Sequence, residues 1–150
     1  TIGLEALKLR PKLKLVAIDK RFGTKEIISE NAKRLDVIPS KIFEEDIKEL
    51  LELEFSEYLG KPTRIVIGGC NKLTKIFIIK RLTPILNKGD IIVLPLVTYE
   101  VLQEIQKIFE EFKYEVNLNL IQTFKGISIS EGTRFEPNNP VFLIKGKKLM

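Results

Sequence analysis

Short apolar runs alternate along this chain with segments whose apolar residues recur at helical spacing, and this alternation limits the fold more than any other feature. Leu13 to Ile18, Arg64 to Ile67 and Ile91 to Leu94 are such runs, and Lys25 to Leu35 is one of the helical segments. Strands that alternate with helices are typical of a mainly parallel sheet covered by helices on both faces. The sequence therefore predicts an α/β fold.

Three more helices are predicted from apolar spacing and from their stop signals. Leu73 to Leu82 ends before Pro84, and Ile47 to Leu59 ends at Gly60, as helices that meet proline or glycine commonly do. The third follows Thr98, a residue type that favours the N-cap position. It carries one apolar stripe made of Val101, Leu102, Ile105, Ile108, Phe109 and Phe112.

The last part of the sequence changes character, because two strand-like segments follow each other without a helix between them. These are Glu115 to Phe124 and Val141 to Lys145. We expect them to form an antiparallel pair at one edge of the sheet. A brief strand is also predicted to begin at Lys41.

Composition bounds the class of protein. The 150 residues, 44% hydrophobic and 30% charged, suit one globular domain over 1–150. Cys70 is the only cysteine and histidine is absent, which excludes an internal disulfide and the usual histidine-containing zinc and catalytic sites. We predict no metal site and assign no catalytic residue. Without a secretory signal or an apolar run long enough to span a bilayer, a cytoplasmic protein is expected.

The net charge of +5 and the pI near 9.3 permit an anionic partner such as nucleic acid, phosphate or a polycarboxylate. Lysine and glutamate alternate instead of clustering, as they do on solvated helix faces, so we do not expect a nucleic-acid partner from charge alone. The abundance of Ile, Lys and Glu is a bias of heat-adapted proteins.

Candidate functional residues follow the predicted strands, because ligands of open α/β sheets bind outside the carboxyl ends of the strands. These residues are Asp19, Asp46, Gly68 to Asn71 and Pro95 to Thr98. An acid at a strand end can accept hydrogen bonds from both hydroxyls of a ribose, or it can simply cap the following turn. The Gly68-Gly69 pair either lets a ligand approach the backbone closely or supplies a turn that needs positive φ.

Taken in order, several blocks carry a family resemblance. They are LEAL at Leu4 to Leu7, VAID at Val16 to Asp19, ISENAKRLDV at Ile28 to Val37, EEDIKELL at Glu44 to Leu51, IVIGG at Ile65 to Gly69, LVTYE at Leu96 to Glu100 and SEGTRFEPNNPVFLIKGKK at Ser130 to Lys148. The early blocks resemble class I S-adenosylmethionine methyltransferases. The later ones resemble the decarboxylating cobalt-precorrin-6B C(15)-methyltransferases of cobalamin biosynthesis.

The resemblance implies S-adenosylmethionine as cofactor, a polycarboxylate cobalt-precorrin as substrate, and a homotetramer. It assigns the ribose to Asp19 and the adenine edge to Asp46, within a cofactor-binding set of Asp19, Lys20, Asp46, Ile47 and Gly68. The substrate-binding set that it implies is Gly69, Thr98, Gly132, Thr133 and Arg134. A basic rim using residues such as Lys72, Lys125 or Arg134 would steer the anionic substrate.

The sequence departs from the family at its start. The family begins with a strand and a glycine-rich loop that cradles the methionine part of the cofactor, and Thr1 corresponds to a position just past those glycines. Gly3 does not replace them. We expect either that residues precede Thr1 in the native protein or that this relative no longer binds the cofactor well. Two alternatives follow, an RNA methyltransferase and a non-catalytic interaction protein that assembles through its terminal strands.

Overall fold

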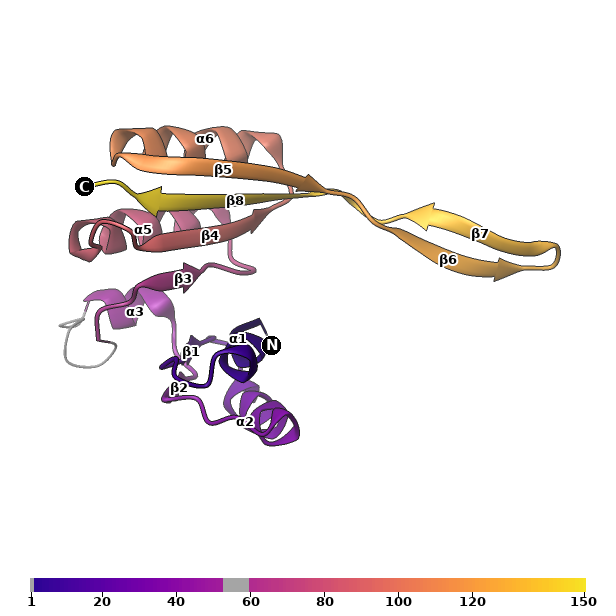
Figure 1. Cartoon of the computed structure of the whole chain (residues 1–150), viewed down its shortest axis with the longest axis horizontal. Helices are drawn as coiled ribbons and strands as arrows, with labels where there is room; N and C mark the ends of the chain where they lie inside the picture. The colour runs from indigo at the N-terminus through magenta and orange to yellow at the C-terminus, as the bar shows by residue number, and fades with distance from the viewer. Residues whose placement is uncertain (1, 53–59) are drawn as a thin grey trace. The chain divides into compact units, whose positions relative to one another are not determined.

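The computed structural model describes residues 2–52 and 60–150. They form two compact units, Thr1–Lys61 and Pro62–Met150 (Figure 1). Helices and strands alternate in both units, which confirms the predicted α/β class. The assignment of 1–150 to a single domain stays a prediction. Within the described ranges, no helix combines the length and hydropathy needed to cross a bilayer.

The first unit pairs two short parallel strands. Its elements in order are α1 (Ile2–Leu9), β1 (Val16–Ile18), α2 (Thr24–Leu35), β2 (Lys41–Phe43) and α3 (Ile47–Glu52). Strand β1 pairs with β2 from Val16↔Lys41 to Ile18↔Phe43, and α1 packs against α2. The helix predicted from Ile47 is observed as α3, while its predicted continuation over 53–59 lies outside the described residues.

The second unit is built on a four-stranded mixed sheet. Its strands β3 (Arg64–Val66), β4 (Ile91–Leu96), β5 (Tyr114–Ile121) and β8 (Val141–Lys148) lie in the order β3-β4-β8-β5. The β3-β4 pair is parallel, as expected where a helix joins consecutive strands. The β4-β8 and β8-β5 pairs are antiparallel. The predicted antiparallel pair at the end of the sequence is therefore confirmed, with β5 as the edge strand.

The core of this unit forms between α6 and the sheet. Helix α5 (Lys72–Leu82) continues into the short 3-10 helix η1 (Thr83–Ile85) and lies beside α6 (Tyr99–Glu111). Alternate residues of β4 are buried, which is the pattern of a strand with one face toward a core. The predicted stripe of α6 supplies the other side, through the buried side chains of Leu102, Ile105, Ile108 and Phe109.

Strand β4 runs two residues further than its sequence predicted, through Pro95 to Leu96. Proline has no N–H to donate and normally ends an interior strand. The Val93 carbonyl accepts from the Ile67 N–H, so the backbone groups of Val93 face β3. Backbone direction alternates along a strand, so the nitrogen of Pro95, two residues later, also faces the β3 side. Strand β3 has already ended there, so the missing N–H costs no bond of the ladder.

A long hairpin was not predicted. Strands β6 (Phe124–Ile129) and β7 (Gly132–Pro137) pair only with each other and project beyond the ends of β5 and β8 (Figure 1). The strand predicted from Glu115 to Phe124 is therefore split into β5 and the start of β6. Gly132 has φ 138°, a conformation that side-chain-bearing residues rarely adopt, and it begins β7 directly after the turn at Ser130 and Glu131.

Candidate functional site

Two carboxylates gather at the carboxyl ends of β1 and β2. Asp19 directly follows β1, and its N–H donates to the Phe43 carbonyl at 3.0 Å, so the ends of the two parallel strands lie side by side. Asp46 follows β2 after a short turn. The ammonium of Lys20 lies 3.1 Å from Oδ2 of Asp46 and links the segments after the two strands. Three of the predicted cofactor-binding residues therefore form one cluster.

The Asp19 carboxylate is fully engaged by its neighbour Arg21. The guanidinium donates to Oδ1 at 3.0 Å and to Oδ2 at 2.7 Å, and the Arg21 N–H donates to Oδ1 at 3.0 Å. These bonds hold the pKa of Asp19 below its ordinary value, against the opposing effect of partial burial. The Arg21 side chain is 80% exposed, so this ion pair lies at the surface.

The Asp46 carboxylate accepts hydrogen bonds from a backbone N–H and from Lys20. Its Oδ1 accepts from the Lys48 N–H at 3.0 Å at the start of α3, which is how an N-cap residue satisfies a helix terminus. That bond and the Lys20 ammonium hold the pKa of Asp46 below its ordinary value. Ile47, the first residue of α3, is half-buried. The capping role and the nucleotide-binding role predicted for this acid are compatible, since Oδ2 is engaged only by an exposed lysine.

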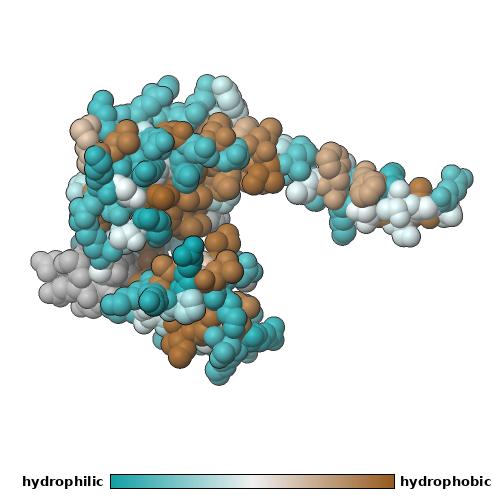
Figure 2. Space-filling view, viewed as in Figure 1, coloured by the Kyte–Doolittle hydropathy of each residue, from teal (hydrophilic) through white to brown (hydrophobic). Residues whose placement is uncertain are grey.

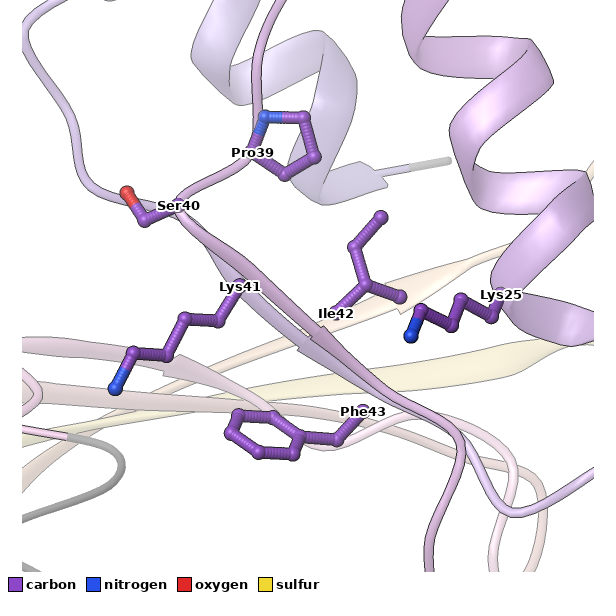
Figure 3. Close-up of a pocket in the computed structure, with 6 residues that line it drawn as sticks. All are labelled: Lys25, Pro39, Ser40, Lys41, Ile42 and Phe43. Carbon is purple, nitrogen blue, oxygen red and sulfur yellow. The ribbon is translucent and has the colours of Figure 1, made fainter.

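An open hollow of about 490 Å³ lies along β2 and contains neither of the two acids. Its lining residues are Lys25, Pro39, Ser40, Lys41, Ile42 and Phe43. Figure 3 shows Lys41 and Phe43 on one side of the strand and Ile42 on the other, as the alternation of a strand requires. The sequence did not predict this hollow, because no motif marks its lining residues.

In the second unit, the loop after β3 contains the predicted Gly68-Gly69 pair. Neither glycine has positive φ, so the interpretation as a turn that requires left-handed backbone is wrong. A Cβ added at either glycine would meet no described atom within 4 Å. The backbone here borders open space, as expected where a ligand approaches closely.

The loops after β3 and β4 leave the sheet at the same edge, because the two strands are parallel neighbours. Thr98 occupies the predicted N-cap position of α6, but its side chain makes no capping bond. It is exposed. Lys72 at the start of α5 pairs with Glu104 of α6 at 2.9 Å. Lys72, predicted as part of a basic rim, is thus held in an ion pair.

The remaining predicted substrate residues lie on the projecting hairpin. Gly132, Thr133 and Arg134 lie opposite Ile129, Ser128 and Ile127 in the ladder. Arg134 forms an ion pair with Glu136 on its own strand. The hairpin extends from the same edge of the sheet as the loops after β3 and β4, since Leu96 and Leu120 both lie opposite Phe142, and Figure 1 shows it projecting outward from that edge. Whether these hairpin residues bind substrate stays a prediction.

The acids at the ends of β1 and β2 suit the nucleoside part of a cofactor. Carboxylate oxygens accept from ribose hydroxyls and from an adenine amino group. Gly3 lies in α1, where an added Cβ would come within 2.8 Å of Leu15 Cδ1, so this glycine allows close helix packing.

The described residues contain no cluster of three potential metal ligands. Arg21 was missed, although its position two residues after Asp19 is a signal for pairing.

Comparison with known proteins gives concordant matches. A family model described as the precorrin methyltransferase domain matches residues 1–148. A precorrin-6y C5,15-methyltransferase from Geobacter metallireducens GS-15 is similar, with a TM-score of 0.79, 25% identity, and coverage of 98% of this chain and 75% of that one. A precorrin 8W decarboxylase from Methanobacterium thermoautotrophicum has a TM-score of 0.69, 22% identity, and coverage of 89% and 69%.

The fold extends to methyltransferases of other substrates. An rRNA methylase from Streptococcus thermophilus has a TM-score of 0.64 with 17% identity, and the alignment covers 100% of this chain and 84% of that one. At this identity the likeness concerns the fold alone. No curated protein sequence matches the chain at a significant level.

Proposed function

The chain belongs to the precorrin methyltransferase domain family, and we propose that it methylates carbon 15 of a cobalt-precorrin and removes the carboxyl group of a neighbouring acetate arm. The family match supports precorrin methylation in cobalamin biosynthesis. The position of the methylated carbon and the decarboxylation go beyond that match and rest on the sequence resemblance.

The observation that carries the proposal within the structure is the cluster of Asp19, Lys20 and Asp46 at adjacent strand ends. S-adenosylmethionine is the proposed donor, and it supplies a methyl group made electrophilic by its sulfonium. Asp19 accepts from the two ribose hydroxyls once Arg21 has moved aside. Asp46 accepts from the adenine amino group through the oxygen that now faces Lys20.

The remaining task of the protein is to hold the acceptor carbon in line with the methyl group and to exclude water. The open backbone at Gly68 and Gly69, with Thr98 at the same sheet edge, forms the proposed border of the acceptor. Loss of carbon dioxide depends on electron withdrawal by the conjugated ring of the substrate, so no protein acid is assigned to it.

Calorimetric titration with S-adenosylhomocysteine tests the nucleoside site. Asp19→Asn is expected to weaken binding about tenfold or more, because it removes charge-assisted hydrogen bonds to the ribose. Asp36→Asn is the matched control, since Asp36 is exposed with φ 54°, a conformation that asparagine tolerates. Equal affinity in wild type and D19N would refute the assignment of the ribose.

The reaction itself is tested with a cobalt-precorrin acceptor and mass spectrometry of the product. Gain of a methyl group together with loss of carbon dioxide is the expected outcome. Methyl gain without carbon dioxide loss would remove the decarboxylating step from the proposal. Methylation of bulk RNA in place of the tetrapyrrole would favour the RNA methyltransferase alternative.

We also propose that the chain assembles into a homo-oligomer, a tetramer by resemblance, through the hairpin of β6 and β7. Phe124 is 59% exposed and Phe135 is 68% exposed, and Figure 2 shows hydrophobic side chains along the projecting arm. Exposed apolar patches of this kind commonly mark protein interfaces.

Analytical ultracentrifugation tests the assembly. The double variant Phe124→Ser, Phe135→Ser is expected to dissociate the oligomer. Phe22→Ser is the control because Phe22 is 99% exposed in the first unit. An oligomer that survives in the double variant would exclude the hairpin as its interface. Assembly without any affinity for S-adenosylhomocysteine would favour the non-catalytic alternative.

A further inference from the structure

Lys75 is a buried lysine near the start of a helix. It belongs to α5, and only 8% of the residue is exposed. Burial penalises a charged ammonium, and the positive end of the helix dipole adds to that penalty. A lysine in this position therefore needs a specific partner that compensates for both effects.

No carboxylate supplies that compensation in the described part of the chain. The ion pairs there involve Lys20, Arg21, Lys72 and Arg134, and the first turn of α5 contains no acidic residue. The ammonium of Lys75 instead donates to the carbonyl oxygen of Cys70. The partner of this buried charge is thus the backbone of the loop after β3.

That loop is held at several points. Cys70 donates its N–H to the Gly68 carbonyl at 2.9 Å, and the Asn71 side chain accepts from the Thr74 N–H at 2.8 Å to cap α5. The hydrogen bond of Lys75 connects the loop to α5, because it joins the carbonyl of Cys70, the residue before the N-cap, to a side chain of the helix. Gly68 and Gly69 have no side chains to pack, so the conformation of the loop depends on such backbone contacts.

We infer that Lys75 is a positioning residue, which fixes the loop from Gly68 to Asn71 in the conformation that borders the acceptor. Its role in ligand binding rests on the proposed function, whereas its role in holding the loop does not. The residue acts through the backbone and does not touch the reacting atoms. A methionine of similar length at this position would fill the same space without donating, and would remove the hydrogen bond from Lys75 to the Cys70 carbonyl.

The single cysteine of the chain makes the loop directly measurable. Cys70 is partly exposed and is the only thiol, so the rate at which a disulfide reagent such as dithiobis(nitrobenzoate) modifies the native protein reports on this loop alone. We expect Lys75→Met to raise the labelling rate severalfold. Lys80→Met is the matched control, because Lys80 is an exposed lysine of the same helix, and its labelling rate is expected to equal that of wild type.

Circular dichroism and thermal unfolding accompany the labelling. K75M is expected to keep the midpoint of unfolding or raise it, since it removes a buried charge. Unchanged labelling in folded K75M would overturn the inference. If the midpoint of unfolding falls at the same time, Lys75 contributes to stability without positioning the loop. If K75M does not fold, Lys75→Leu decides by the same comparison, because leucine also fills part of the space without a donor or a charge.

Ligand binding separates this inference from the proposed function. With S-adenosylmethionine as methyl donor and the precorrin as acceptor, K75M is expected to raise KM for the acceptor severalfold, and Lys75→Arg is expected to restore part of the wild-type value. If wild type binds neither ligand while K75M still labels faster, the proposed function fails and the loop role stands. If K75M and K80M match wild type in labelling and KM, the positioning role is refuted while the proposed function stands.

Discussion

The close contact between Gly146 and Phe109 leads to a quantitative prediction for stability. Gly146 lies in the interior strand β8, opposite Ile92 of β4 and Val116 of β5. A Cβ at this position would lie 2.7 Å from Cε2 and 2.8 Å from Cζ of Phe109, which is fully buried. Gly146→Ala should therefore overpack the core and destabilise the protein by about 1–3 kcal/mol. For a chain of this size, that corresponds to a fall of about 2–12 °C in Tm.

A double-mutant cycle tests the reasoning, because leucine has no atoms at the ring positions that an alanine Cβ would meet. In a Phe109→Leu background, the cost of G146A should fall by at least about 1 kcal/mol. Urea unfolding gives each free energy, with an unchanged m value as the sign of an intact native state. Gly126→Ala on the exposed hairpin is the control, since its nearest contact is 3.3 Å to Thr133 Cγ2. Equal costs of G146A in both backgrounds would refute the proposed clash.

Two further predictions concern side chains that make hydrogen bonds. Tyr114→Phe should cost about 1–2 kcal/mol at neutral pH, because the buried Thr83 hydroxyl loses its partner at 3.0 Å. Burial raises the pKa of Tyr114 above its ordinary value of 10.0, with Thr83 opposing and Asp90 adding to the shift. The unfolded chain then ionises this phenol first, so unfolding of wild type should become easier relative to Y114F as the pH rises above about 10. A constant difference between the two proteins from pH 8 to 11, measured in urea, would contradict this. Asn71→Ala removes the cap on the Thr74 N–H and should cost about 1 kcal/mol, whereas an unchanged urea midpoint would show that the cap contributes nothing.

The spacing of apolar residues predicted those elements that bury one face at regular intervals. The stripe of α6 was read from the sequence because one helical face buries side chains every three or four residues. The hairpin was missed because nothing local ends β5 at Ile121. The Asn138 N–H and side-chain amide both bond to Thr123, and this contact joins distant positions. Gly132, directly after the turn of the hairpin, was the one local signal for it.

The strand ends that carry the candidate acids could be predicted, since the carboxyl end of a buried strand follows from the sequence pattern, while the ligand roles of these residues stay predictions. Asp19 and Asp46 follow neighbouring strands, and the ion pair between Lys20 and Asp46 joins segments that the pairing of β1 with β2 brings together. The engagement of Asp19 by Arg21 is a choice among side-chain rotamers, which composition and spacing do not specify. The cytoplasmic location and the heat-adapted habitat stay predictions from composition.

The position of β8 inside the sheet constrains how the second unit is made. Ribosomes deliver the strands in sequence order, yet β8, the last of them, separates β4 from β5 and pairs Leu94 with Ile144. Until it emerges, the nascent chain exposes the unpaired edges of two strands and the apolar face of α6, a state prone to misassembly. Contacts between such distant segments also form slowly. This unit should therefore reach its native form only after β8 has left the ribosome, and mutations in β8 should lower the yield of folded protein more than equally costly mutations in β3.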